Sequence, residues 1–432
     1  MAMVVKNNMS ALSTLNTLNR NTTALSKSLQ KVSSGMKINS AADDASGYAI
    51  SERMRVQIRS LDQANSNAQN GGSMMKVAEG AVSSTVEILK TLKEKAVNAA
   101  NDTNTDADRA TIQKEMDQSI DQINDNANVT FNGQYLVDGS KNKKVEQTTT
   151  AMTNQSLSTG TAKTTALTDL KARNGDSLNI HSTDTVTVSY VKDGKTHTSS
   201  VQVGTKTLSG VIKSLTSGAV TIRSANSQIG FDASLNTVNT ASGESAITIA
   251  SNASGINGQI AGFTIYITDN KGNVNKSANA ALDAFDETIR AQNKSEDNSI
   301  VMQVGTKAGQ SIKVGLTDMK AQALGLQGKN GETLSIGNQE KANAAINVLD
   351  AAIQKALDQQ TTIGAVESRL EYTQANLTTA SENVTAAEST IRDADMAKEM
   401  TEYTKNNVLM QAAQSMLAQA NQSSSNALSL LQ

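Results

Sequence analysis

The stretch that decides the fold runs from Leu61 to Ala100 and reads LDQANSNAQNGGSMMKVAEGAVSSTVEILKTLKEKAVNAA. Small or apolar residues recur every seven positions, and a second set follows each of them after three positions. A repeat of this length predicts one long helix, about 46–100, that packs in a bundle or coiled coil. Gly71 and Gly72 interrupt it, which predicts a close approach of another helix or a kink. The two sets are Leu61, Ala68, Met75, Val82, Leu89 and Ala96, and Ala64, Gly71, Ala78, Thr85, Leu92 and Ala99.

A second run near the C-terminus alternates steps of four and three residues, and a similar spacing precedes it with a phase slip near Ile363. A shorter amphipathic segment, 106–128, lies between the two long runs, with Asp102 or Asp106 as its expected N-cap. The three segments predict one helical bundle built from both halves of the chain. Its expected core residues are Leu61, Met75, Val82, Leu89 and Leu92 from the first run, and Val366, Leu370, Leu377, Val384 and Ile391 from the second.

Both ends of the chain repeat this pattern with smaller residues. Such a helix pair buries little apolar area, which does not offset the ordering entropy of its residues. We therefore expect both ends to be poorly ordered in a monomer and to fold against other copies. The expected polymerisation seams are Leu18, Leu25, Leu29, Val32 and Met36 near the N-terminus, and Tyr403, Met410, Leu417 and Leu431 near the C-terminus.

The middle of the chain loses the helical period after Ser140. Residues 185–203 alternate around Asp193-Gly194, a hairpin signal, and 300–314 predict another hairpin. Strands are expected at 246–250 and 263–269, and one helix at 278–291. The fold class is therefore α+β: an elongated antiparallel helical bundle or coiled coil formed by both chain ends, with a β-hairpin region and an inserted mixed α/β domain.

Composition argues against several classes of function. The chain has 39 basic and 41 acidic residues and lacks an apolar run long enough to span a bilayer, so neither nucleic acid nor a membrane is an expected partner. It has no Cys, Pro or Trp and only 2% aromatic residues, which is unlike a compact enzyme with a lined pocket. His181 and His197 lack the context of a zinc site. The acidic pairs at helix boundaries are interpreted as N-caps. We therefore expect no catalytic, cofactor or metal site. These acidic pairs are Asp43 with Asp44, and Asp393 with Asp395.

Several separated segments resemble the sequence motifs of one known family. Residues 33–51 read SSGMKINSAADDASGYAIS, 131–134 read FNGQ, 392–395 read RDAD, 417–422 read LAQANQ and 428–432 read LSLLQ. In this order, over about 1–140 and 297–432, they resemble bacterial flagellin, the main subunit of the flagellar filament. The insert resembles no family that we can name.

The resemblance implies a structural subunit that polymerises with other copies for motility. It assigns 1–42 and 393–432 to a terminal coiled-coil domain of the inner tube, and 43–140 and 297–392 to a helical rod domain with a β-hairpin. Residues 141–296 would be the exposed variable domain. Flagellins leave the cell uncleaved through a type III apparatus, which fits the absence of a signal peptide in MAMVVKNNMS at the start. The implied partners are an export chaperone on 393–432, the filament cap and the hook-junction proteins, and the implied location is the extracellular filament.

Flagellins that activate a vertebrate Toll-like receptor present an arginine and a leucine on the long helix. Here Thr91 and Lys95 stand at those positions, whereas Glu94 and Glu115 match the acidic ones, so the resemblance implies weak activation. A hook–filament junction protein is the nearest alternative, because its chain ends are similar. A metallopeptidase insert would need a zinc-binding helix motif, which is absent, and an adhesive role for residues 141–296 stays open.

Overall fold

The computed structural model describes residues 8–429, and the chain divides into two compact units. Unit 1 contains the chain up to Ala68, residues 303–310 and the chain from Tyr372 onward; unit 2 contains residues 69–302 and 311–371. Long helices from both halves of the chain and a strand-rich centre confirm the predicted α+β class. Among the described helices, none combines the length and the apolarity that crossing a bilayer requires.

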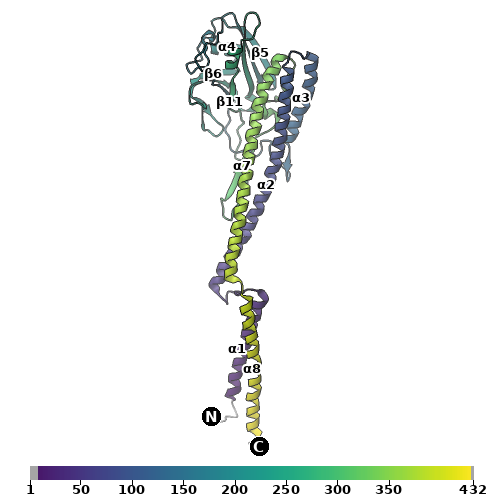
Figure 1. Cartoon of the computed structure of the whole chain (residues 1–432), viewed down its shortest axis with the longest axis vertical. Coiled ribbons are helices and arrows are strands. Elements are labelled where there is room, and N and C mark those ends of the chain that lie inside the picture. The colour runs from purple at the N-terminus through teal and green to yellow at the C-terminus, as the bar shows by residue number, and fades with distance from the viewer. Residues whose placement is uncertain (1–7, 430–432) are drawn as a thin grey trace. The chain divides into compact units, whose positions relative to one another are not determined.

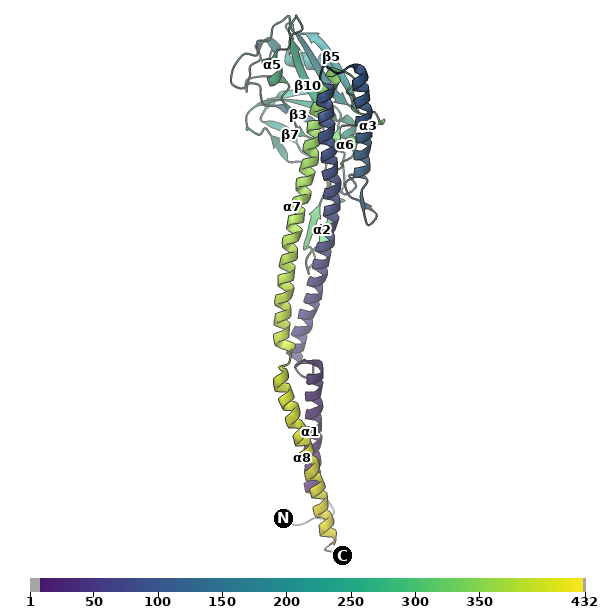
Figure 2. The same cartoon turned by 45° about the vertical axis from the view of Figure 1, so that its right-hand side comes forward.

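Unit 1 is built around helices α1 (Met9–Ser34) and α8 (Met396–Ser429), which lie side by side (Figures 1 and 2). The side chain of Asn8 caps the start of α1 by accepting a hydrogen bond from the amide of Ala11 (3.0 Å). Gly35 ends α1 at φ 72°, a left-handed conformation that glycine adopts without strain. Helix α1 is therefore bounded at both ends by local signals in the sequence.

The helix predicted over 46–100 is confirmed as α2 (Ala45–Ala99), and a second long helix, α7, spans Gln339–Arg392. The glycine pair causes no break in α2. All twelve heptad positions from Leu61 to Ala99 are buried. On α7, Leu370 and Leu377 are buried, whereas Val366, Val384 and Ile391 are half-buried.

The acidic residues at the helix boundaries divide into caps and turn residues. Asp44 accepts hydrogen bonds from the amides of Ser46 and Gly47 at the start of α2, and Asp395 does the same for Ala397 and Lys398 at the start of α8. Asp43 and Asp393 are not N-caps, contrary to the prediction. Asp43 instead holds the preceding turn, and Asp393 accepts from the hydroxyl of Ser389.

In unit 2, α3 (Asp106–Ala127) lies beside the second half of α2 (Figure 2), and Asn126 donates to the hydroxyl of Ser84 (3.0 Å). The predicted N-cap of α3 was wrong: Thr105 forms a capping box with Asp108, because a threonine hydroxyl just before the helix reaches the free amides better than either candidate aspartate. A short helix, α6, spans Ala321–Leu324.

The strand-rich part of unit 2 contains a three-stranded sheet of order β10-β4-β5 and a four-stranded sheet of order β11-β3-β9-β6. Apolar side chains of both sheets, with helices α4 (Leu208–Leu215) and α5 (Lys276–Leu282), form a buried core around Phe263. The predicted hairpins at 185–203 and 300–314 and the strands at 246–250 and 263–269 are confirmed. The strands are β1 Thr130–Phe131, β2 Gln134–Tyr135, β3 Ala151–Asn154, β4 Thr185–Lys192, β5 Lys195–Gln202, β6 Val220–Asn226, β7 Gln228–Phe231, β8 Thr237–Asn239, β9 Ala246–Ser251, β10 Ile260–Thr268, β11 Phe285–Ile289, β12 Ile300–Gln303 and β13 Ser311–Val314.

The single helix predicted over 278–291 was wrong. Helix α5 ends at Leu282, and β11 follows and pairs with β3 in the register Phe285↔Asn154. The ring of Phe285 packs edge-on against Phe263, with 5.3 Å between the centroids. The residues that pair with β11 and pack on Phe285 come from other parts of the chain. Tertiary packing therefore overrides a local preference for helix over 285–289.

Candidate assembly surface

The pairing of α1 with α8 is antiparallel, and four polar contacts fit one register. The side-chain amide of Asn8 donates to the backbone carbonyl of Ala420 (3.2 Å). The side-chain amide of Asn21 donates to the backbone carbonyl of Leu409 (3.1 Å). The other two are a hydrogen bond from Asn406 to the hydroxyl of Ser28 (3.0 Å) and an ion pair between Lys31 and Glu399 (3.5 Å).

The contact between the two helices is shallow. Among the residues whose side chains the structure describes, Ser28, Ala413 and Ala420 are the ones on these helices that are buried. All three are small, so the pair gains little from removing apolar surface from water. A lone α1–α8 pair therefore has few contacts that stabilise it.

The seam residues expected from the sequence lie at different depths. Three seam residues on each helix are half-buried, whereas Leu29 of α1 is 51% exposed. Met36 lies just beyond α1 and forms an isolated bridge with Asp393. Leu431 lies outside the described residues. The half-buried seam residues within the helices are Leu18, Leu25 and Val32 on α1, and Tyr403, Met410 and Leu417 on α8.

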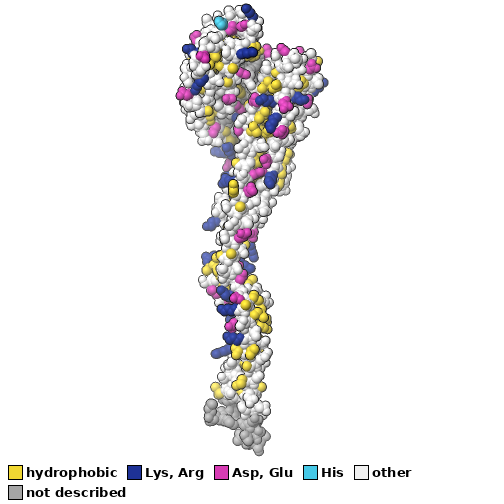
Figure 3. All heavy atoms as spheres, in the orientation of Figure 1, with side chains coloured by type: hydrophobic (Ala, Val, Ile, Leu, Met, Phe, Trp, Pro, Cys, Tyr) yellow, Lys and Arg dark blue, Asp and Glu magenta, His cyan; other side chains and the backbone are white. Residues whose placement is uncertain are grey.

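A further set of large apolar side chains on this pair is exposed, and we call it the exposed apolar set. Figure 3 shows hydrophobic side chains gathered on the surface of the α1–α8 pair. Because an α-helix advances about 100° per residue, Met400 and Leu409 lie on opposite sides of α8. One partner helix cannot cover both sides. The set comprises Met9, Leu12, Leu15 and Leu29 on α1, and Met396, Met400, Val408, Leu409 and Met416 on α8.

Comparison with known proteins then decides the family. Residues 5–142 match the model of the bacterial flagellin N-terminal helical region, and residues 346–431 match that of the C-terminal helical region. The chain is 36% identical to a flagellin of Clostridium tyrobutyricum, across 97% of this chain and 99% of that one. It is 32% identical to a flagellin of Bacillus subtilis, across 99% of this chain and all of that one. The chain belongs to the bacterial flagellin family.

As a flagellin, the chain is a structural subunit of a filament. Among solved structures, a flagellar hook-associated protein from Legionella pneumophila is 14% identical and covers 79% of this chain with 98% of its own, at a TM-score of 0.35. That score is too low to support a shared function. The relatives matched by sequence include proteins named flagellin, which favours the filament subunit over a junction protein.

The residues of this flagellin at the receptor-type positions lie on α2 and α3. The ammonium group of Lys95 donates to the carboxylate of Glu115 (2.9 Å), and the Thr91 hydroxyl donates to the backbone carbonyl of Glu87 within the same helix. Thr91 and Glu94 are exposed. Lys95 therefore presents a charge that is already paired with Glu115.

The two histidines lie apart from any ligand set. His181 is 75% exposed at its side chain, and His197 stacks on Tyr190 with 5.0 Å between the ring centroids. Burial and the nearby Lys192 and Lys195 lower the pKa of His197. Among residues 8–429, the structure shows no cluster of three or more His, Cys, Asp or Glu side chains that could hold a metal.

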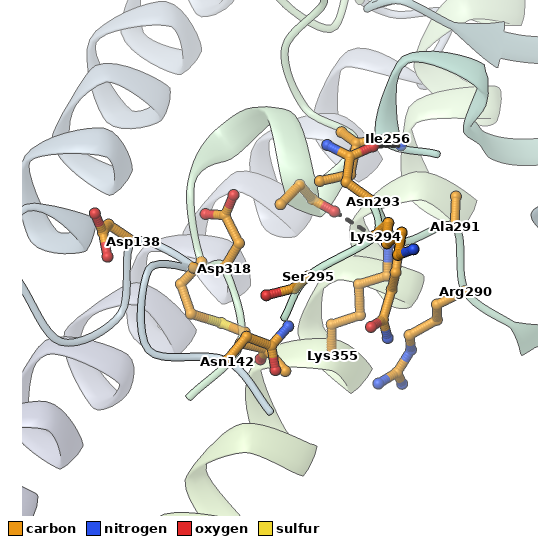
Figure 4. A pocket seen from close by; sticks show the side chains of 15 residues that line it. Asp138, Asn142, Ile256, Arg290, Ala291, Asn293, Lys294, Ser295, Asp318 and Lys355 are labelled. Atoms are coloured by element: carbon orange, nitrogen blue, oxygen red, sulfur yellow. Dashed lines mark hydrogen bonds between the residues drawn. The ribbon is translucent and has the colours of Figure 1, made fainter. Parts of the chain in front are cut away.

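A cavity of about 240 Å³ lies in unit 2, where the two segments that connect the insert meet α6 and α7 (Figure 4). Lys355 of α7 reaches its wall and donates to the carbonyl of Ala323 (3.2 Å), and its amine lies 3.7 Å from Glu287 of β11. Burial lowers the pKa of Lys355. The polar groups here hold the insert on α7, so the cavity is part of that attachment.

Sequence reasoning had singled out Leu29 but missed most of the exposed apolar set. Leu15 and Met396 continue the predicted seams, three residues before Leu18 and seven before Tyr403, whereas Leu409 and Met416 form a separate set, seven residues apart. A search for a second phase on the same helices would have found them. The sequence of one chain does not show which of these apolar residues the partner helix covers and which stay exposed.

Proposed function

We propose that this flagellin polymerises by burying the exposed apolar set of its α1–α8 pair against neighbouring copies. The observation that carries the proposal is the exposure of nine large apolar side chains, between 41% and 68%, on a pair that is itself shallow. Fully burying such a side chain contributes about 1.5–3 kcal/mol, so several half-exposed ones together can offset the cost of association. Because they lie on opposite sides of α8, more than one neighbour is needed to cover them.

The experiment compares apolar and polar substitutions on one helix. Replacing Met400, Leu409 and Met416 by serine should abolish the elongation of filament seeds by the purified chain, as seen by negative-stain electron microscopy and sedimentation. The matched control replaces Gln414 and Gln419, which are exposed polar residues of α8, by serine and should elongate normally. Normal filaments from the apolar variant would contradict the proposal.

We further propose that the two chain ends become well ordered only when the chain joins a filament. The shallow contact between α1 and α8 supports the idea that these helices are dynamic in the soluble chain and become protected in the filament. Amide exchange in both states tests it: rapid exchange over residues 9–34 and 396–429 in the soluble chain and slow exchange in filaments is expected. Full protection in the soluble chain would contradict it.

For the division of labour, we propose an inner tube made by 1–42 and 393–432, a surrounding layer made by 43–140 and 297–392, and an exposed domain made by 141–296. The change from long helices to sheets between Ser140 and Asp297 supports this division. Limited proteolysis of intact filaments should cut within 141–296 before it cuts either terminal segment.

We also propose that the chain reaches the filament by export and that a chaperone first covers α8. The exposed side chains Met400, Val408, Leu409 and Met416 would otherwise associate prematurely in the cytoplasm, and a partner with an apolar groove fits this helix. The filament cap and the hook-junction proteins are expected to contact the same pair at the ends of the filament. Membership of a structural family supports the further proposal that the chain is not an enzyme.

Weak contact with the Toll-like receptor is proposed from Thr91 and Lys95. The ion pair of Lys95 with Glu115 would have to be separated or buried at the centre of an interface, which is unfavourable. Replacing Thr91 by arginine and Lys95 by leucine should increase the response of a receptor reporter cell line. Equal responses from the original chain and the double variant would contradict the proposal.

A further inference from the structure

The two segments that most resemble the family meet in unit 1, although more than three hundred residues separate them. The amide of Lys37 donates to the carbonyl of Arg392 (2.7 Å), and the amide of Ala394 donates to the carbonyl of Gly35 (2.9 Å). Met36 and Asp393 form an antiparallel bridge between these two hydrogen bonds. The end of α1 is thus bonded to the short segment that separates α7 from α8.

The side chain of Arg392 extends this contact to α2. It donates to the carboxylate of Glu52 (2.6 Å) and to the hydroxyl of Ser51 (3.3 Å), and its guanidinium lies 5.4 Å from the centre of the Tyr48 ring. Arg392 is only 6% exposed. The hydrogen bond from Arg392 is the main cause that lowers the pKa of Glu52. Both hydrogen bonds come from one guanidinium nitrogen, so a lysine could replace them in part, but it lacks the planar group that lies near the Tyr48 ring. We call this group of contacts the Arg392 clasp.

The helix pair beyond the clasp has little to fix its register. Small and apolar residues recur along both helices at steps of three, four and seven, so a slide of α1 along α8 by one heptad brings similar residues together. The pair buries only small side chains. Of the four polar contacts described above, only the one between Asn406 and Ser28 involves a buried residue, Ser28; the others join exposed or half-buried groups. The clasp, in contrast, is anchored by a buried arginine at the place where α1 ends and α8 begins.

We propose that Arg392 is a positioning residue for assembly: its clasp sets the register in which α1 meets α8. That register fixes where the exposed apolar set of each copy stands, and therefore what neighbouring copies can bind. The inference rests on the proposed polymerisation through this pair and adds the residue that aligns it.

Because the chain has no cysteine, introduced pairs report the register directly. Ser28→Cys with Asn406→Cys joins side chains that touch in the structure, and Ser28→Cys with Ala413→Cys reports a slide of one heptad. Filaments and soluble chains are oxidised in parallel, and the yield of each intramolecular disulfide is measured by mass spectrometry. With Arg392 intact, the first pair should form in excess. Arg392→Gln should lower the ratio of the first disulfide to the second several-fold, and Arg392→Lys should lower it partly.

Arg55→Gln is the matched control. Arg55 also pairs with Glu52 (3.8 Å) and with Glu388 (3.6 Å). However, its side chain is 38% exposed, and these ion pairs involve neither the segment after α1 nor the segment between α7 and α8. Its substitution should leave the disulfide ratio unchanged. An unchanged ratio in Arg392→Gln, in filaments or, if that variant does not assemble, in the soluble chain, would overturn the clasp. If the chain with Arg392 intact forms no filaments, polymerisation fails, and the ratio in the soluble chain still tests the clasp.

Discussion

Among single residues, Glu287 and Lys355 join the insert to the helical part of unit 2. Their side chains are 6% and 8% exposed, and their charged groups lie 3.7 Å apart. Arg290 adds a second cation 3.8 Å from Glu287. The oxygens of Glu287 have no hydrogen-bond partner among the described residues, so the carboxylate depends on these charges. A buried pair of this kind contributes little net stability, but breaking it leaves a charge without compensation.

We therefore expect each single change, Glu287→Gln or Lys355→Met, to lower the free energy of unfolding of unit 2 by about 3–5 kcal/mol. The double variant should lower it much less than the sum of the two, because it leaves no unpaired charge from this pair. Denaturant unfolding of the full chain, followed by circular dichroism, measures all three. Lys313→Met is the control: its pair with Asp297 is exposed, so its loss should cost less than about 1 kcal/mol. Additive single effects would contradict this view.

Sequence reasoning found the acidic helix boundaries but not which residue caps each helix. Asp44 and Asp395 cap as expected, whereas Thr105 takes the role given to its neighbours. The buried Arg109 was also missed: it donates to the carbonyl of Ala99 at the end of α2. Contacts of this kind depend on the path of the chain between two helices, which a single sequence does not specify.

At the scale of elements, packing against α2 accounts for Gly71. A Cβ atom added at Gly71 would clash with the sulfur of Met302 on β12, within unit 2. The close approach predicted from the sequence is therefore made by a strand rather than by another helix. A Cβ atom added at Gly80, in the same helix, would meet no heavy atom within 4 Å.

The two glycines should respond oppositely to alanine. Gly80→Ala should stabilise α2 by about 0.5–1 kcal/mol, because alanine loses less backbone entropy in a helix. Gly71→Ala gains the same entropy but must displace Met302, and overpacking costs about 1–3 kcal/mol, so it should destabilise. The thermal midpoints of the two variants, measured by calorimetry, should lie on either side of that of the unchanged chain. A Gly71→Ala variant as stable as Gly80→Ala would show that no close contact exists.

Elements with strong local signals were predicted well. Residues 185–202 alternate around an Asp-Gly turn and form β4 and β5, and the heptads from Leu61 to Ala99 lie in one continuous helix, α2. Residues 278–291 failed because their first half is helical and their second half pairs with β3, about 130 residues earlier in the chain. Local propensity cannot distinguish such a change of element from one continuous helix.

For the whole molecule, the sequence indicated the helical ends, and the seams that it predicts on them include only some of the large apolar side chains of α1 and α8. Leu18, Leu25 and Val32 are half-buried, whereas Met400, Leu409 and Met416 are exposed and were not expected. In a single chain these two groups look alike, since both are apolar residues at helical spacing. Which of them contacts its own partner helix, and which remains for another copy, depends on tertiary packing.

The insert is packed on the helices of unit 2 rather than loosely attached. A Cβ atom added at Gly262 of β10 would lie 2.7 Å from the side chain of Val348 on α7, so strand and helix are in direct contact. The two ends of the insert also meet: the amide of Asn298 donates to the carbonyl of Asn142 (3.1 Å). Removing the insert therefore needs almost no new chain to close the gap, but it uncovers an apolar face of α7.

A deletion variant tests both observations. In it residues 143–296 are removed and Asn142 is joined to Asp297 through a glycine. Its thermal midpoint should fall, because Val348 and its neighbours lose their cover and become exposed. Its elongation of filament seeds at low temperature should persist at a rate close to that of the full chain, because α1 and α8 are untouched. Calorimetry and seeded assembly followed by light scattering measure the two effects separately. A deletion chain that keeps its helical circular dichroism but adds to no seed would mean that the insert itself takes part in assembly, and that the α1–α8 pair is not sufficient for it.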